Sequence, residues 1–417
     1  MTTDTSGIPI PGSGPRGRAM FSSLRHAPYR LLLIGQFVGT IAVWSQRIAV
    51  DWILLEMTGD LALVGSLVAL QFGPVLLFGL WGGVLVDRHS LRTLLLISQT
   101  TSLGVGAVLA ATALSSTMTP LLIFVCAGVQ GLAAVVDQPA RQVLVSRVVS
   151  PNDLANAISM NSISFQVGGM IGPAVSGALL AASDGAGAFV FSLSLQAVAF
   201  AALVALFARA RFEAQERSAR ARGQIMAGLR YALSKPEIRD TLLLLVFVCL
   251  VGLNWPVLLV AMTTVEFHSG ADGYGLANTA LAAGSFVGAL ISLRRVHRGL
   301  RTVVFAVCAV CTFRMACGVA PREWVFLLGI AATGIWLILL WTAANSLLQW
   351  SSNSAVRGRI MSIYLMISVG GQALGGPLLG WACATVGPRT TLLVSGALPL
   401  CAAAVLGILH RRRRSRM

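Results

Sequence analysis

Residues 83–92 read Gly-Val-Leu-Val-Asp-Arg-His-Ser-Leu-Arg, a short charged segment between two long apolar ones. The apolar segments are 62–86 before it and 92–114 after it. Each is long enough to cross a bilayer as a helix, because a span needs roughly 20 residues to cover about 30 Å of hydrocarbon. A charged turn of this length between two spans indicates a helical hairpin in a membrane.

Similar apolar segments recur along all 417 residues. Apolar residues make up 56% of the chain and charged residues 11%, more apolar surface than one soluble core could bury. Lipid offers no partner for backbone amides, so segments of this length are helical. We predict an all-α membrane protein with twelve transmembrane helices at 30–55, 62–86, 92–114, 119–143, 154–182, 187–208, 241–266, 274–293, 302–319, 324–350, 358–383 and 390–409.

The basic residues lie on one side of the predicted membrane. Of 31 arginines and lysines, 27 fall in the two tails and the even-numbered loops, whereas only Arg322 and Arg389 fall in the opposite loops. By the positive-inside rule, this asymmetry predicts that both termini lie in the cytoplasm. The 30 arginines against a single lysine, Lys235, are typical of a GC-rich bacterial genome, so we expect the membrane to be a bacterial inner membrane. The net charge of +16 then faces lipid headgroups, and we expect no nucleic-acid partner.

A polar segment at 209–240 divides the spans six and six. Its basic residues surround a short apolar pattern at Ile225, Met226, Leu229 and Leu233, which predicts a helix along the cytoplasmic membrane surface. The halves align at an offset near 204 residues, which places Gly172-Pro173 over Gly376-Pro377. Such a repeat implies two pseudosymmetric bundles with a site between them at mid-membrane. The predicted units are a tail at 1–29, a six-helix bundle at 30–208, the linker at 209–240, a second six-helix bundle at 241–409 and a basic tail at 410–417.

No catalytic or cofactor-binding pattern accompanies these spans. The seven cysteines lie within predicted spans, the five histidines lie in tails, loops or span ends, and no G-x-x-x-x-G-K-[ST] phosphate loop is present. We therefore expect no enzyme, no metal site, no cofactor and no ATP hydrolysis of the phosphate-loop kind.

The charged segment at 83–92 resembles the signature loop of the major facilitator superfamily, G-x-L-a-D-R-x-G-R-R/K. The matching residues include Gly83, Asp87, Arg88 and Arg92. The two positions before the last arginine depart from the pattern. The resemblance implies the major facilitator fold, and implies that this loop latches the two bundles together on the cytoplasmic side.

This latch needs partners for its carboxylates. Asp87 is expected to cap the positive N-terminus of the eleventh span, next to Arg357 and Arg359. Asp137, at the end of the fourth span, is expected to pair with one of the loop arginines; the alternatives are a local i,i+4 pair with Arg141 and a direct contact with substrate. An unpaired carboxylate at this depth is costly, so a partner is nearly obligatory.

The fifth span resembles the G-x-x-x-G-P-x-x-x-G motif of the drug:proton antiporter branch of this superfamily. Its motif residues are Gly168, Gly172, Pro173 and Gly177. Glycines at this spacing let a neighbouring helix approach closely, so generic helix packing is the alternative reading. Gly273-Tyr274-Gly275 and the segment from Arg357 to Met361 resemble the enterobactin-exporter and macrolide-efflux group of that branch, which implies efflux and multidrug resistance.

The resemblance implies that spans one, four, seven and ten line the substrate cavity. The candidate residues on them are Gln36, Trp44, Gln46, Gln130, Asn254, Trp255, Trp341, Asn345 and Gln349. The last three repeat every four residues and so share one helical face. Aromatic and amide groups without fixed charge suit an amphiphilic substrate. The alternative is that Asn345 and Gln349 only bond neighbouring helices.

Charged residues inside the spans are candidates for proton coupling. Asp51 lies one helical turn after Arg47, and an i,i+4 pair would keep Asp51 ionised until helix movement separates the two. Alternatively, Asp51 only neutralises Arg47, and Glu266 or Asp137 carries the proton. Arg314 in the ninth span is expected to snorkel or to pack structurally.

Together these patterns predict a secondary-active exporter of a small amphiphilic molecule, such as a drug, siderophore or other secondary metabolite. Proton antiport by alternating access is the expected mechanism. Membrane lipid, the substrate and protons are the expected partners of a monomer. The alternatives are a solute importer or facilitator, and a lipid-handling or sensory membrane protein on the same fold.

The charge asymmetry makes a prediction about topology. Cysteines introduced at Asp184 and at Arg217 should lie outside the cell and in the cytoplasm, respectively. An impermeant maleimide should therefore label position 184 and spare position 217 in intact cells, on a background whose native thiols do not react. The reverse labelling pattern would overturn the orientation.

Overall fold

The computed structural model describes residues 22–150, 153–183, 185–209, 224–252, 254–294 and 299–414. These residues form helices joined by short turns, without a β-strand in the described part. The topology probes at Asp184 and Arg217 fall outside the described residues, as do the side chains of Asp87, Ile225 and Met226.

The first half of the chain forms six long helices after a short 3-10 turn, Ser22–Arg25. These helices are α1 (Ala27–Thr58), α2 (Leu61–Arg88), α3 (Leu91–Leu114), α4 (Pro120–Val148), α5 (Leu154–Ser183) and α6 (Ala186–Arg209). Each carries one of the first six predicted spans.

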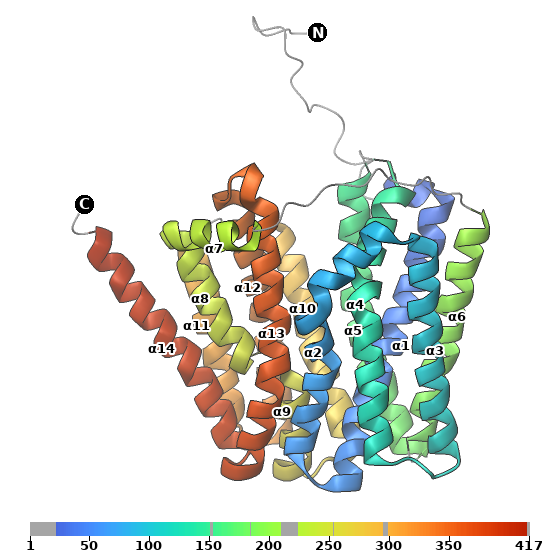
Figure 1. The fold of residues 1–417 in the computed structure, drawn as a ribbon. Helices are drawn as coiled ribbons and strands as arrows, with labels where there is room; N and C mark the ends of the chain where they lie inside the picture. The colour runs from blue at the N-terminus through green and yellow to red at the C-terminus, as the bar shows by residue number, and fades with distance from the viewer. Residues whose placement is uncertain are drawn as a thin grey trace, which may run out of the picture.

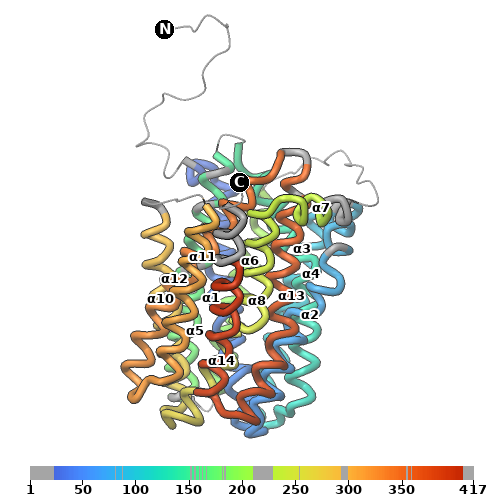
Figure 2. The backbone as a smooth tube through the Cα atoms, turned by 90° about the vertical axis from the view of Figure 1, so that its left-hand side faces the viewer, coloured from blue at the N-terminus to red at the C-terminus, as the bar shows by residue number. Residues whose placement is uncertain are grey.

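The second half forms another bundle after a short linker helix, α7 (Gln224–Ser234), which lies across the ends of the bundle helices (Figure 1; Figure 2). Its elements are α8 (Pro236–Gly252), α9 (Trp255–Ala261), the π-helical turn η2 (Met262–Glu266), α10 (Gly270–Arg294), α11 (Leu300–Gly318), α12 (Glu323–Ser351), α13 (Ser354–Val386) and α14 (Pro388–Arg414). The described residues contain twelve helical segments that are long and apolar enough to cross a membrane, which confirms the predicted number of spans.

Local sequence explains where helices begin and end. The α1 helix stops at Gly59, whose φ of 64° is the left-handed conformation that glycine adopts without strain. Asp60 then accepts a hydrogen bond from the Ala62 amide at 2.7 Å and so caps α2. In the charged loop, Ser90 accepts from the Thr93 amide at 3.1 Å and caps α3.

The seventh span differs from the sequence prediction of one continuous helix at 241–266. It is divided into α8, α9 and η2, with a break between Gly252 and Trp255. Pro256 explains the break, because proline has no N–H for the carbonyl four residues earlier and its ring collides with that carbonyl. The carbonyl in question belongs to Gly252, the last residue of α8.

The helices form two bundles that face each other across the molecule. Helices α1 to α6 make one bundle and α8 to α14 the other, with α2 packed along α13 and α5 packed along α10 (Figure 1). The α1 helix begins and α14 ends on the same side, at the top of Figure 1. We call this the terminus side, and the opposite side the far side.

The bundles touch through backbone on the far half of the molecule. A Cβ at Gly376 of α13 would lie 2.7 Å from the carbonyl oxygen of Gly65 of α2, and one at Gly380 would lie 2.9 Å from the Gly65 Cα. The contact between α5 and α10 is equally close, since a Cβ at Gly177 of α5 would lie 2.6 Å from the Cα of Gly275 of α10. Only glycine leaves room for this approach, so these contacts close the far side.

This glycine contact predicts the effect of one added methyl group. The Gly376→Ala variant should disfavour closure of the far side by about 1–3 kcal/mol, because its Cβ meets backbone that cannot move aside. Spin labels at exposed Ser116 and Arg322 should then show a larger population at long distance. Gly104→Ala, whose Cβ meets nothing within 4 Å, is the matched control. An unchanged distance distribution in Gly376→Ala would contradict the closure role.

Candidate functional site

A buried carboxylate joins the two bundles near the far-side contacts. Asp51 of α1 is 0% exposed, and its Oδ2 accepts a hydrogen bond from the Tyr274 hydroxyl of α10 at 3.3 Å. The Trp52 ring stacks on Tyr274 with a centroid distance of 6.3 Å. Because Tyr274 adjoins Gly275, this polar contact lies beside the close approach of α5 and α10.

The expected direct ion pair between Arg47 and Asp51 is absent from the ion pairs of the described residues. The Arg47 guanidinium instead lies over two rings, 4.8 Å from the centre of Phe72 and 5.2 Å from that of Trp44. Aromatic faces attract a cation, and here they hold it away from the carboxylate. The two charges still attract each other electrostatically.

The other two proton candidates have partners within their own bundles. Glu266 accepts from Arg389 Nε of α14 at 2.6 Å, and Arg389 also donates to the Ala320 carbonyl at 2.8 Å. Asp137 accepts from Arg141 Nε at 2.6 Å, so it forms the local i,i+4 pair. Helix geometry explains this choice, since residues four apart face each other.

The environment of Asp137 is completed by α3. Ser98 and Gln99 donate to its Oδ1 at 2.9 and 3.2 Å. Arg88 and Arg92, the expected partners, are exposed to the surroundings. The expectation that Asp137 pairs with these arginines is therefore corrected to a pair with Arg141.

Gly83 and Asp87 lie in the last turns of α2 at the terminus side, so the segment predicted as a charged turn is helical up to Arg88. Arg357 and Arg359 lie in the first two turns of α13, and Arg357 is exposed. Because the Asp87 side chain falls outside the described residues, its cap on α13 stays a prediction.

The glycine motif of α5 makes two different contacts. A Cβ at Gly168 would lie 2.9 Å from Thr40 Cγ2, and one at Gly172 would lie 2.8 Å from the Ile41 carbonyl oxygen, both on α1. Gly177 instead meets α10 of the other bundle. The motif, which continues through buried Pro173, therefore serves packing inside one bundle and contact between bundles.

Two of the cavity candidates are bonded inside the first bundle. Gln46 is 8% exposed, and its Oε1 accepts from the Gln196 amide of α6. Gln130 donates to Ser102 of α3 at 3.0 Å. The side chains of Gln36 and Trp44 are half-buried on α1, and the Trp44 ring packs edge-on against Phe165 of α5, 6.0 Å between centroids.

Asn254 and Trp255 occupy the break in the seventh span. With its amide oriented to satisfy both neighbours, Asn254 donates to the Gln372 carbonyl at 3.0 Å and accepts from the Gly376 amide at 3.2 Å. Both residues are almost fully buried. Asn254 therefore bonds the broken helix to α13, and neither residue faces an open cavity.

Two of the three tenth-span candidates, Trp341 and Asn345, line a cavity of about 280 Å³ that is wide open to its surroundings. Trp341 and Asn345 share it with Thr342, Ser346 and Tyr364, and the Tyr364 ring packs edge-on against Trp341 at 5.5 Å. Gln349 donates to the Asn345 Oδ1. The cavity wall combines aromatic rings with amide and hydroxyl groups and carries no charged side chain.

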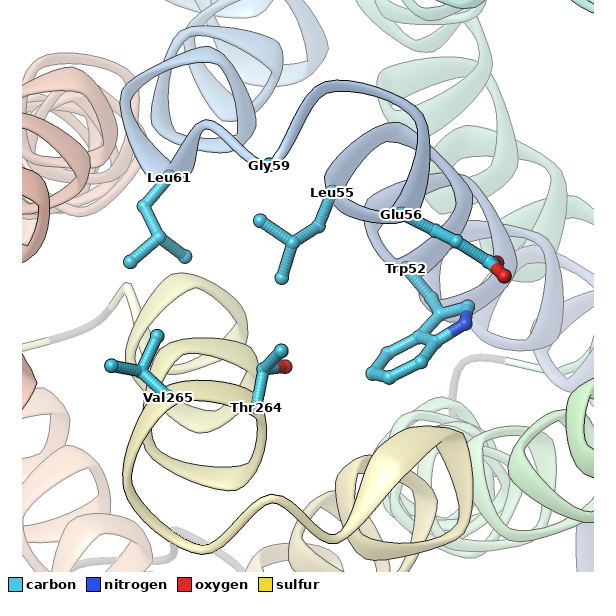
Figure 3. Close-up of a pocket in the computed structure, with 7 residues that line it drawn as sticks. All are labelled: Trp52, Leu55, Glu56, Gly59, Leu61, Thr264 and Val265. Carbon is cyan, nitrogen blue, oxygen red and sulfur yellow. The ribbon is translucent and has the colours of Figure 1, made fainter.

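A second cavity, of about 250 Å³, lies on the far side between the bundles. In Figure 3, Leu55 and Leu61 of the first bundle face Thr264 and Val265 of η2 across it. Trp52, Glu56 and Gly59 complete the lining.

Sequence reasoning missed Tyr274 and Tyr364 as site residues. Tyr274 stands between two glycines, and the preference of a tyrosine hydroxyl for a buried partner is a signal that could have found it. Tyr364 belongs to the span that faces α12, which only the packing of helices reveals.

Comparisons with known proteins agree with this architecture. A family model described as transmembrane secretion effector matches residues 18–416. The enterobactin exporter EntS of Citrobacter koseri is 27% identical over 383 residues, 89% of each chain. The staphyloferrin A transporter of Staphylococcus aureus is 23% identical, over 92% of this chain and 94% of its own.

Solved structures share the fold at low sequence identity. A POT family transporter in complex with a thioalcohol-conjugated peptide has a TM-score of 0.73 at 12% identity, over 92% of this chain and 96% of that chain. A D-xylose-proton symporter has a TM-score of 0.71 at 14% identity, over 93% of this chain and 97% of that chain.

The fold and the comparisons define a multi-pass membrane transporter of the major facilitator superfamily, at the family level a transporter and not an enzyme. Its twelve spans and the bacterial exporters among its relatives support a place in the bacterial inner membrane. The chain belongs to the transmembrane secretion effector family and is related to siderophore exporters.

Proposed function

We propose that this protein exports a small amphiphilic organic molecule, of the siderophore or drug type, from the bacterial cytoplasm in exchange for protons. The observation that carries the proposal is the match to two siderophore transporters over about nine tenths of the chain. One of these relatives is named an exporter. The terminus side is then the cytoplasmic side, in keeping with the distribution of basic residues.

The cavity around Trp341 supports this substrate class. Aromatic rings offer apolar contact area, and the Asn345 amide offers a donor and an acceptor. An anionic substrate such as a phosphate would favour a basic residue in the wall, and the wall residues of this cavity are uncharged. A molecule with aromatic and polar faces fits this lining best.

Alternating access requires the far side to close and open in turn. The glycine contacts between α2 and α13 and between α5 and α10 support a state closed on the far side. We propose that the loop at 83–92, with Asp87 against the start of α13, closes the terminus side in the alternate state. Each state would then be closed on one side of the membrane and open on the other.

Asp51 is the proposed proton site, because it lies on the contact that must open. Three polar groups face it, namely Arg47 of its own helix, Gln71 of α2 and Tyr274 of α10. Far-side opening would separate Asp51 from Tyr274 and admit water, so that the carboxylate gains access to protons from the outside. Far-side closure would cut off that access, and opening of the terminus side would let the proton leave to the cytoplasm.

The export proposal predicts that the chain replaces a lost siderophore exporter. In bacteria that make enterobactin but lack its exporter, expression should raise secreted enterobactin several-fold over an empty vector, and a protonophore should abolish the gain. Secretion that continues in the presence of the protonophore would rule out proton antiport as the mechanism. If the cells instead take up added enterobactin and a panel of aromatic drugs above the empty-vector level, the direction is import.

The proton site predicts a separation of two activities in purified protein. Asp51→Asn should reduce gradient-driven efflux to background in proteoliposomes while downhill substrate exchange continues, because exchange needs no proton transfer. Tyr274→Phe is the matched control, since it removes the hydrogen bond but keeps the carboxylate, and it should retain coupled transport. An Asp51→Asn variant that still concentrates substrate would exclude Asp51 as the coupling group.

A further inference from the structure

Arg314 is a charged residue in the interior of the second bundle, away from the proposed proton and substrate sites. It lies in α11 and is 1% exposed, so it does not snorkel to a membrane surface. Its Nη1 and Nη2 donate to the carbonyls of Gly252 and Val251 at 2.7 and 2.6 Å, and its Nε donates to Ser395 of α14 at 2.8 Å. Among the described residues it forms no ion pair with a carboxylate.

The break in the seventh span explains these contacts. In a continuous helix the Gly252 carbonyl would accept from the amide of residue 256, but Pro256 has no amide hydrogen. The last carbonyls of α8 are therefore left without helical partners, at a depth where lipid offers none. Arg314 supplies the missing donors from the neighbouring helix.

The same contacts stabilise the positive charge of Arg314 in the protein interior. A charge at this depth needs a compensating charge, and the C-terminus of a helix carries a partial negative charge on its free carbonyls. The Trp255 ring adds a second favourable contact, 4.6 Å from the guanidinium. The broken helix and the arginine therefore require each other.

The break also lies next to the contact between the bundles. Asn254 bonds to Gln372 and to Gly376 of α13, and Gly376 packs on Gly65 of the other bundle. Beyond the break, α9 continues into η2, whose Thr264 and Val265 line the far-side cavity (Figure 3). A change of angle at the break would therefore move one wall of the far side.

We propose that Arg314 is a positioning residue that holds the end of α8 while α9 and η2 turn at Pro256 to open the far side. The guanidinium replaces the helical hydrogen bonds that the break leaves out, so it satisfies these carbonyls in lipid and, by fixing the end of α8, limits how readily the hinge turns. The proposal rests on alternating access in the proposed function but not on the substrate or on the coupling ion.

The hinge can be tested without a substrate, by the labelling rate of a cysteine in the far-side cavity. Leu55 is 6% exposed, so Leu55→Cys should react with an impermeant maleimide only while the far side is open. Purified protein in nanodiscs is used, and the same protein with Leu55 intact measures the reaction of native thiols. A failed export assay would leave this measurement unaffected.

Two substitutions should change the labelling rate in opposite directions. Pro256→Ala restores the amide for Gly252 and stiffens the span, so labelling should slow by about fivefold or more. Arg314→Lys keeps the charge but loses the planar fork that reaches two carbonyls and Ser395, so labelling should quicken. A purely structural role would change both rates in the same direction or neither.

A double-mutant cycle then tests whether Arg314 acts on the break. Arg314→Met should lower the melting temperature strongly alone and much less together with Pro256→Ala, because the restored amide satisfies the Gly252 carbonyl. Ser395→Ala is the control, since it removes one Arg314 partner away from the break, and Pro256→Ala should not rescue it. Equal losses from Arg314→Met in both backgrounds, or a Pro256→Ala rate equal to the parent's, would overturn the proposal.

Discussion

The hydrogen bonding of backbone groups in lipid is the constraint on which the rest of the structure depends. A bilayer offers no partner for a peptide N–H or carbonyl, so each span is helical and each departure from helix needs a local replacement. At Gly59 and Asp60 the turn satisfies itself with a left-handed glycine and a side-chain cap. At Gly252 the replacement comes from a different helix, as the guanidinium of Arg314.

The same constraint explains which parts of the fold follow from sequence. Span number is a property of hydropathy and length, and the twelve segments agree with the helices of the described residues. The break at Pro256 could not be seen in the hydropathy of the sequence. Most residues on both sides of it are apolar, so the mean hydropathy of the span stays high. A proline two residues after an asparagine in a span was the available signal, and its meaning depends on a donor 58 residues after Pro256, at Arg314.

Side-chain partners were harder to predict than spans, for a geometric reason. Sequence spacing identifies neighbours on one helix, and the Asp137–Arg141 pair is of this kind. It cannot identify competition from other helices, which is why Arg47 lies over Phe72 of α2 and not against Asp51. Gln46 likewise bonds to Gln196 of α6, since helix rotation within the bundle decides which face of α1 meets which neighbour.

The glycine contacts between the bundles have a consequence for the speed of conformational exchange. Interfaces built from interlocking side chains must withdraw those side chains before the surfaces separate, which raises the activation barrier. At Gly65 with Gly376, and at Gly177 with Gly275, the surfaces are smooth backbone. Such surfaces can slide or part with few rotamer changes. The glycine contacts between the bundles can therefore close tightly and still separate with few side-chain rearrangements.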